Sequence, residues 1–130
     1  MQIVFIHALL MAAGLTAVAA AAFIAITQRK RRWWLKAHRP SGITGAIFML
    51  AGFIAAGMMK EGDGSSLVPQ IHSFIGGSAI VLVCIAPVLG LLMFRLKKKW
   101  MRPAHRWAGR FAVLFAVINL ALGLFMTGLI

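Results

Sequence analysis

Four histidines are spaced almost evenly along the 130-residue chain, and histidine is the side chain best suited here to bind a metal. The intervals between them are 31, 34 and 33 residues, and the four positions are His7, His38, His72 and His105. Each stands close to the start of a long apolar run. A membrane-spanning helix needs about 20 apolar residues, so each interval fits one helix plus one loop. The spacing therefore predicts one imidazole near one end of each of four helices.

The distribution of positive charge sorts these histidines by membrane depth. Segments 28–39 and 95–106 each hold six Lys or Arg and no acid, whereas segment 60–69 is nearly neutral. Because cytoplasmic loops are enriched in Lys and Arg, we expect loops 28–39 and 95–106 to be cytoplasmic. Both termini and loop 60–69 would then lie outside. The first and third helices would run inward, which places His7 and His72 near the outer face. His38 and His105 would lie near the inner face.

Two imidazoles at one depth suit some metal sites better than others. A zinc site needs four protein ligands, or three and a water, and the helices offer no acid or second cysteine to complete one. A porphyrin supplies four ligands itself, so two histidines complete six-coordinate iron. This favours two bis-histidine b-type haems over two bare metal ions. The lone Cys84 excludes a Cys-x-x-Cys-His site for covalent haem. Two alternatives stay open: purely interfacial histidines, and copper binding by the eight irregularly spaced methionines.

Several neighbours of the histidines could contact a haem. Three histidines are followed four positions later by glycine, which leaves room for a flat ring on the same helix face; these glycines are Gly42, Gly76 and Gly109. His7 is followed at the same spacing by Met11, which can pack on an apolar ring. Three arginines are candidates to neutralise haem propionates, although they could equally reach the interface; they are Arg39, Arg106 and Arg110. Asn119 could form an interhelical hydrogen bond or contact a haem or quinone.

The composition sets the fold class. Hydrophobic residues make up 62% of the chain, and the mean hydropathy of +0.91 is too high for a soluble domain of this size. The net charge of +12 lies mainly in two loops, so it indicates membrane topology rather than binding of nucleic acid. The first apolar run has no basic start and is too long for a signal peptide, so we expect it to remain a helix. The predicted spanning segments are 3–27, 42–59, 70–94 and 104–129.

The chain contains an internal repeat. A shift of 67 positions places Trp33 on Trp100, and it also aligns Ala37, His38, Arg39 and Gly42 with Ala104, His105, Arg106 and Gly109. Upstream of each copy stands an Ile-His pair, at Ile6-His7 and Ile71-His72. The prediction is therefore an all-α integral membrane protein, with residues 1–130 forming one four-transmembrane-helix bundle built from two repeated helix hairpins.

These residues resemble the core of the cytochrome b561 family. The segment His105-Arg106-Trp107-Ala108-Gly109-Arg110, with the later Val117-Ile118-Asn119-Leu120-Ala121-Leu122-Gly123-Leu124, is similar to the last haem-ligand helix of that family. His7-Ala8-Leu9-Leu10-Met11 resembles its first ligand helix, and His72-Ser73-Phe74-Ile75-Gly76 with Ala86-Pro87 resembles the third. His38 with Gly42 resembles the second more loosely. The resemblance covers nearly the whole chain, although family members usually carry two further flanking helices.

The resemblance implies a four-helix bundle that holds two haem b groups, with His7 pairing His72 and His38 pairing His105. We therefore expect transmembrane electron transfer, as an electron carrier or a transmembrane oxidoreductase, in the bacterial cytoplasmic membrane. The electron donor and acceptor would be ascorbate, a quinol or a redox protein. The alternative is a haem-bearing or quinone-contacting anchor subunit of a larger redox complex, and a homodimer is a further option. A proton-coupled exporter needs a membrane-embedded acid, and Glu61 and Asp63 both fall in a loop.

Overall fold

The computed structural model describes residues 2–59 and 67–128, and nearly all of this part of the chain is helical. The four helices are α1 (Gln2–Thr27), α2 (Trp34–Gly57), α3 (Leu67–Leu96) and α4 (Met101–Thr127). Each is long and apolar enough to cross a membrane. The predicted all-α membrane fold with four spanning helices is confirmed. Most of loop 60–69, including both acidic residues, lies outside the described residues.

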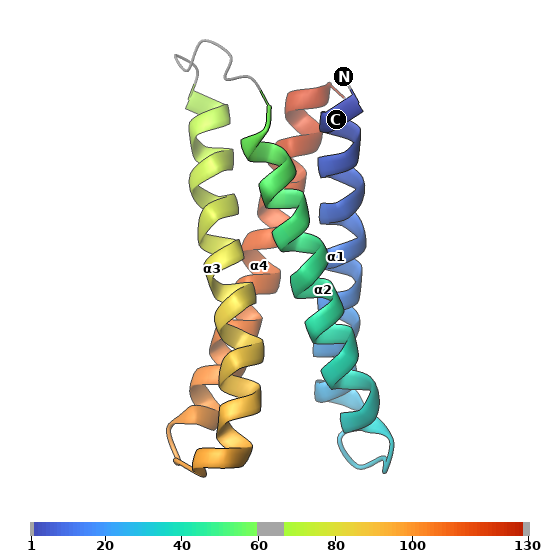
Figure 1. Ribbon diagram of the computed structural model, residues 1–130, viewed down its shortest axis with the longest axis vertical. Helices are drawn as coiled ribbons and strands as arrows, with labels where there is room; N and C mark the ends of the chain where they lie inside the picture. The colour runs from blue at the N-terminus through green and yellow to red at the C-terminus, as the bar shows by residue number, and fades with distance from the viewer. Residues whose placement is uncertain (1, 60–66, 129–130) are drawn as a thin grey trace.

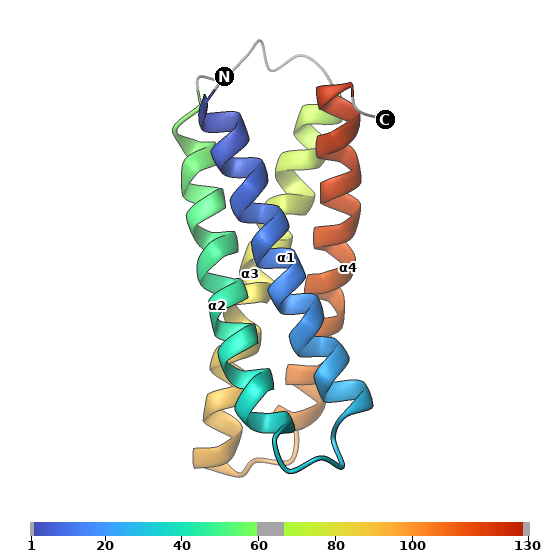
Figure 2. The same ribbon diagram turned by 90° about the vertical axis from the view of Figure 1, so that its right-hand side faces the viewer.

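Consecutive helices run in opposite directions, as Figures 1 and 2 show. The start of α1 and the end of α4 therefore share one end of the bundle, which we call the terminal end. The α1–α2 and α3–α4 connections share the other, which we call the basic end. α1 packs along α2 and α3 along α4, whereas α2–α3 and α1–α4 contacts are much sparser. The bundle consists of two tight hairpins, α1–α2 (the first hairpin) and α3–α4 (the second), with a looser interface between them.

Small residues bring the two helices of each hairpin together. A Cβ added at Gly14 would lie 2.9 Å from the carbonyl oxygen of Gly45, and a Cβ added at Gly45 would lie 2.8 Å from that of Gly14. The two backbones are thus in direct contact, a packing that small residues permit between membrane helices. The repeat relates α1 to α3 by 65 positions and α2 to α4 by 67. In the second hairpin, Ala79 therefore corresponds to Gly14, and Ala112 corresponds to Gly45. Both alanines are almost fully buried.

A small apolar core fills the middle of the bundle. It draws on both hairpins and consists of Met49, Ala79, Ile80, Val83, Ala112 and Ala116. Among the described residues, Met49 is the only fully buried member of this core from the first hairpin, and it has no exposed surface. In the register of each helix this core falls between the histidines near the terminal end and those near the basic end. It therefore separates the two levels at which histidines occur.

Helices α2 and α4 begin earlier than the apolar runs predicted. α2 starts at Trp34 rather than at residue 42, so His38 and Arg39 lie within the helix. α4 starts at Met101, three residues before the predicted boundary. Hydropathy locates the membrane-embedded part of a helix, but a helix continues through charged residues whose side chains reach water. Pro40 lies inside α2, where it removes one backbone hydrogen bond without ending the helix.

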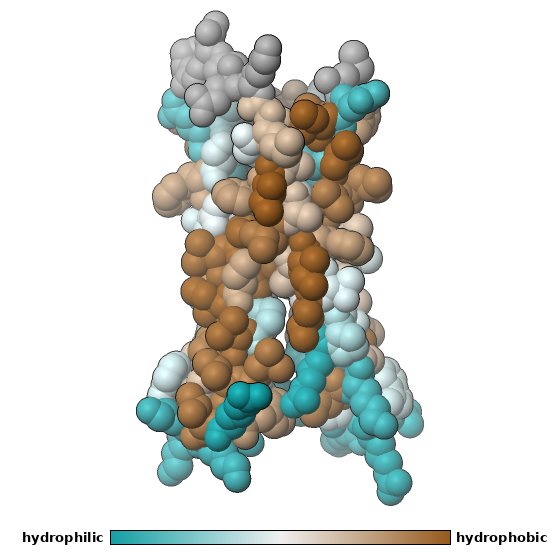
Figure 3. Space-filling view, viewed as in Figure 1, coloured by the Kyte–Doolittle hydropathy of each residue, from teal (hydrophilic) through white to brown (hydrophobic). Residues whose placement is uncertain are grey.

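The surface matches a protein surrounded by lipid. Figure 3 shows apolar side chains over the middle of the bundle and hydrophilic ones gathered at the basic end. Many large apolar side chains are exposed on the outside of the helices, including Phe74, Leu9 and Phe23. Trp33, Trp100 and Trp107 lie near the basic end and are about half exposed. Tryptophan favours the membrane interface, so these three side chains mark its position on the bundle.

Candidate functional site

The four histidines form two facing pairs, one toward each end of the bundle. His7 of α1 faces His72 of α3, with ring centres 6.4 Å apart and ring planes at 76°. His38 of α2 faces His105 of α4, with ring centres 6.0 Å apart and planes at 89°. The structure thus brings together the two pairs that the topology predicts. Each pair takes one histidine from each hairpin, so both pairs span the sparse interface between the hairpins.

Three of the imidazoles are fixed by a backbone carbonyl of the neighbouring helix in their own hairpin. His7 Nδ1–H donates to the oxygen of Gly52 at 2.8 Å, and His38 Nδ1–H donates to that of Ala21 at 2.9 Å. In the second hairpin, His105 Nδ1–H donates to Ala86 at 2.7 Å. A carbonyl oxygen can only accept, so Nδ1 must carry the proton in each case. The neutral ring then has an unprotonated Nε2, which is free to bind a metal.

His72 is the exception. Its Nδ1 is buried and has no hydrogen-bond partner. The backbone of Asn119 lies close enough to interact with it electrostatically, but the contact does not have the geometry of a hydrogen bond. By the repeat, Asn119 corresponds to Gly52, which is the acceptor for His7. His72 therefore lies near the backbone carbonyl of Asn119, which is the acceptor expected from the repeat, but no hydrogen bond fixes the ring to it.

The two histidine pairs lie at two levels with a regular separation. Ala21, the acceptor for His38, stands fourteen residues after His7 on α1, and Gly52, the acceptor for His7, stands fourteen residues after His38 on α2. The same separation holds between His105 and Asn119 on α4. At 1.5 Å per residue, fourteen residues of helix correspond to about 21 Å. The pairs are therefore separated by most of the ~30 Å thickness of the hydrocarbon core.

The spacing within each pair fits one metal ion between two imidazoles. Two metal–nitrogen bonds of about 2 Å, plus roughly 1 Å from each ring centre to its nitrogen, place the ring centres about 6 Å apart. The observed 6.0 and 6.4 Å agree with this value. Among residues 2–59 and 67–128, no group of three or more His, Cys, Asp or Glu comes together. Each pair can therefore offer two nitrogen atoms to a metal, which is the number that a porphyrin iron would need from the protein.

The glycines that face the imidazoles are not those that the sequence singled out. A Cβ added at Gly90 would lie 3.1 Å from Cε1 of His105, and one added at Gly123 would lie 3.2 Å from Cε1 of His72. Both glycines belong to the opposite helix of the same hairpin. The predicted glycines stand four positions along the same helix as their histidine. Gly90 and Gly123 instead each follow the histidine of their own helix by eighteen residues, and this equal spacing, combined with the antiparallel pairing within the hairpin, is the signal that could have found them.

The predicted glycines have different surroundings. Gly76 is buried, and a Cβ added there would lie 2.7 Å from Nδ2 of Asn119. At Gly42 the nearest atom to such a Cβ would be Cβ of Ala21 at an ordinary 3.7 Å, and at Gly109 no atom would lie within 4 Å. Gly109 thus borders open space. The role of these glycines beside a haem stays a prediction.

The remaining predicted residues lie around the histidines. The thioether of Met11 packs against Gly52, where it would lie 3.0 Å from an added Cβ. The guanidinium of Arg39 lies over the ring of Phe94 at 4.2 Å and so links α2 with α3. Arg110 is exposed and lies 5.1 Å from the ring of Trp107 on its own helix. Arg106 is also exposed, so all three arginines can reach an anionic group at the basic end.

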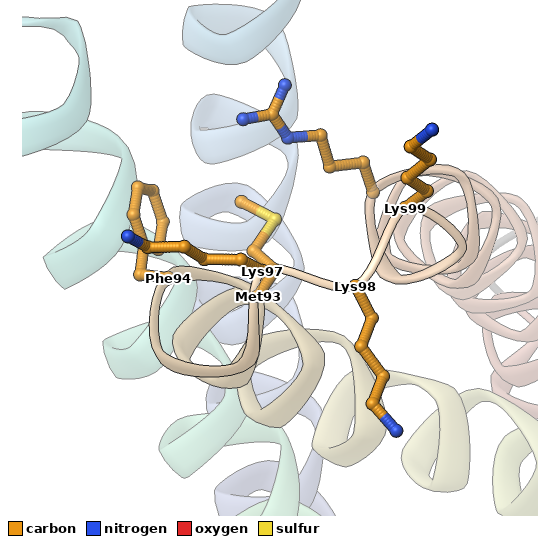
Figure 4. A pocket seen from close by; sticks show the side chains of 6 residues that line it. Met93, Phe94, Lys97, Lys98 and Lys99 are labelled. Atoms are coloured by element: carbon orange, nitrogen blue, oxygen red, sulfur yellow. The ribbon is translucent and has the colours of Figure 1, made fainter.

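A basic pocket of about 400 Å³ opens at the α3–α4 connection. Its apolar part consists of Met93 and Phe94, and its basic part comprises Lys97, Lys98, Lys99 and Arg102. Figure 4 shows Lys97 extending toward Phe94, whereas Lys98 points the other way. Lys97 has a φ of 51°, a left-handed conformation that lets the chain turn between the two helices. The pocket gives the basic end a concentrated positive charge that can attract anions.

Comparison with known proteins identifies a family. The family model described as eukaryotic cytochrome b561 matches residues 6–129, which is nearly the whole chain and includes all four histidines. No curated protein sequence and no solved structure gave a significant match.

Proposed function

Because this chain belongs to the cytochrome b561 family, whose members bind b-type haem and transfer electrons across membranes, we propose that it carries electrons between two haems held at the two histidine levels. His7 and His72 would hold one haem near the terminal end. His38 and His105 would hold the other near the basic end. When bound, each haem supplies a one-electron couple at its iron.

The observation that carries this proposal is the facing geometry of the histidines. Each pair joins the two hairpins at a ring separation that suits one metal ion. Three of the four rings are already fixed by a backbone carbonyl in the tautomer that leaves Nε2 free. Such fixation lowers the cost of ordering the ligands when a metal binds and strengthens their basicity. Unfixed interfacial histidines would have no reason to share this arrangement.

The rest of the chain separates and insulates the two levels. The mid-bundle core around Met49 excludes water between them, and the exposed apolar surfaces of the helices face lipid. About 21 Å of helix separates the levels, so a haem held at each level would divide the transfer across the membrane into shorter steps. The protein would thus contribute axial ligation, burial and local charge, which together set the redox potentials.

We infer that the basic end faces the cytoplasm of a bacterial cell. The support is the concentration of Lys and Arg at the two connections there, together with the tryptophans beside them. The pocket beside Phe94 and the exposed arginines would attract an anionic donor such as ascorbate to this end. A quinol or a redox protein remains a candidate on either side.

A reduced-minus-oxidised absorption spectrum combined with a haem assay tests the proposal. We expect purified protein to show b-type bands and two haems per chain. Colourless protein, or a ratio near one, would contradict the two-haem proposal. Copurifying subunits, with no electron transfer by the isolated chain in vesicles, would favour the alternative function as an anchor subunit of a larger complex.

A further inference from the structure

The two hairpins differ at one pair of positions beside the terminal-end histidines. In the first hairpin, the large side chain of Met11 on α1 packs against Gly52 on α2. In the second, the repeat-related residues are Gly76 on α3 and Asn119 on α4, and here the large side chain comes from α4. One side of the contact thus stays glycine, while the apolar thioether opposite it is replaced by a smaller, polar carboxamide. Packing alone does not require that change.

Asn119 and His72 each contain a buried polar atom without a hydrogen-bond partner. Asn119 is only 4% exposed, and neither its Oδ1 nor the Nδ1 of His72 is paired. These are the only such side-chain atoms in the part of the chain that the structure describes. A buried polar group without a partner destabilises the folded protein, so two of them at one helix contact need an explanation. Their chemistry is complementary, since a neutral imidazole can donate from Nδ1 and a carboxamide oxygen accepts.

The two side chains belong to the same contact between α3 and α4. The ring of His72 lies against Gly123, one helical turn after Asn119, and the carboxamide of Asn119 lies against Gly76, one turn after His72. Each residue therefore packs on the glycine that follows the other. The backbone of Asn119 already interacts electrostatically with His72. Both unpaired atoms therefore belong to one helix contact, and a hydrogen bond between them, direct or through a water, would give each a partner.

We propose that Asn119 is a positioning residue for His72, whose Nδ1–H donates to Oδ1 of Asn119 directly or through one water. His72 would then be the only histidine oriented by a side chain rather than by a backbone carbonyl. An acceptor at Nδ1 makes the imidazole a stronger electron donor to a metal and stabilises the oxidised state. This inference rests on the proposed function, and it would make the two haem sites electronically unequal.

The test is a redox titration of wild-type protein and of Asn119→Leu, which keeps a branched side chain but has no acceptor. We expect the reduction potential of the His7/His72 haem to rise by about 59 mV, which corresponds to an about tenfold shift of its one-electron equilibrium toward the reduced state. The potential of the His38/His105 haem should be unchanged. Nitrogen NMR of ¹⁵N-histidine-labelled reduced protein should show a shifted Nδ1 signal for His72 alone. Ile118→Leu, on the exposed side of the same turn, is the control and should resemble the wild type.

A second variant keeps the test decisive if Asn119→Leu loses haem. In Gly76→Ala the added Cβ would meet Nδ2 of Asn119 at 2.7 Å and displace the carboxamide without altering its chemistry, so the same haem should shift in the same direction. Unchanged potentials and an unchanged His72 signal in variants that bind both haems would overturn the inference, as would equal shifts of both haems. A wild-type protein without haem would instead contradict the proposed function. The NMR comparison in that haem-free protein would still report on the His72–Asn119 hydrogen bond.

Discussion

His38 donates a hydrogen bond to the carbonyl of Ala21, a residue on the helix that carries His7. The relationship is reciprocal, because His7 donates to Gly52 on the helix that carries His38. Each helix of the first hairpin thus holds one histidine and fixes the histidine of the other. A hairpin therefore orients one histidine for each level, and neither level is complete until the second hairpin supplies the facing ring.

This arrangement predicts how histidine variants combine. His7→Leu and His72→Leu should each remove one haem, and the double variant should lose no more than either single variant, because both ligands serve the same site. His7→Leu combined with His38→Leu should lose both haems. Haem-to-protein ratios measured on purified variants check this pattern. Loss of both haems in folded single variants, or additive loss in the His7/His72 double variant, would refute the pairing.

The angle between facing rings predicts a spectroscopic signature. With haem bound between rings at 76° and 89°, the two iron d orbitals that overlap with the imidazoles would be nearly equal in energy. We therefore expect strongly anisotropic low-spin signals in the electron paramagnetic resonance spectrum of the oxidised protein. Two such signals should appear, and His105→Leu should remove one of them. Signals typical of parallel ring planes would show that the rings reorient when haem binds.

The contact between Gly90 and His105 should be sensitive to one methyl group. In Gly90→Ala the new Cβ would lie 3.1 Å from Cε1 of the ring, so the imidazole must move by a few tenths of an ångström. Displacing a fixed ligand typically costs about 10-fold or more in metal affinity. Haem-transfer experiments to a competing apoprotein should show this loss at the basic-end site only. Gly77→Ala on the same helix is the control, since no atom lies within 4 Å of its added Cβ.

The fold itself should depend on the contact between Gly14 and Gly45. Gly45→Ala would place a Cβ 2.8 Å from backbone atoms of α1, which cannot move aside as a flexible side chain can. We expect a loss of about 1–3 kcal/mol in the free energy of unfolding in detergent, the usual cost of overpacking. Gly57→Ala, at the end of α2 with no neighbour in range, should be nearly neutral. Similar stabilities for the two variants would show that the hairpin can separate locally without cost.

Cysteine labelling tests the proposed orientation in the membrane. In a Cys84→Ala background, Gln2→Cys at the terminal end should react with an impermeant maleimide on intact cells. Lys98→Cys, at the basic end, should react only after the membrane is made permeable. The opposite pattern would place the basic end outside and would contradict the assignment from positive charge.

The sequence was sufficient to predict which histidines share a level, but not which groups orient their rings. Apolar length, the repeat and the loop charges predicted four helices and the two histidine levels, because membrane thickness and charge asymmetry act on whole segments. The acceptors Ala21, Gly52 and Ala86 contribute only backbone oxygens, so their side chains carried no signal. Gly90 and Gly123 act across a helix contact whose register depends on packing. For the same reason, the position of Gly76 along α3 did not indicate that Asn119 of α4 fills the space next to it.

The sparse contact between the hairpins has a consequence for how such a molecule could arise. The second hairpin repeats the sequence pattern of the first, and each contributes one histidine to each level. Two identical hairpins related by a twofold axis along the membrane normal would therefore place every histidine opposite its own counterpart and build both histidine pairs. A gene that encodes a single hairpin would be sufficient for that ancestor. Duplication and fusion would then have freed the two halves to diverge, and the exchange of Met11 and Gly52 for Gly76 and Asn119 is a difference that a symmetric ancestor could not have had.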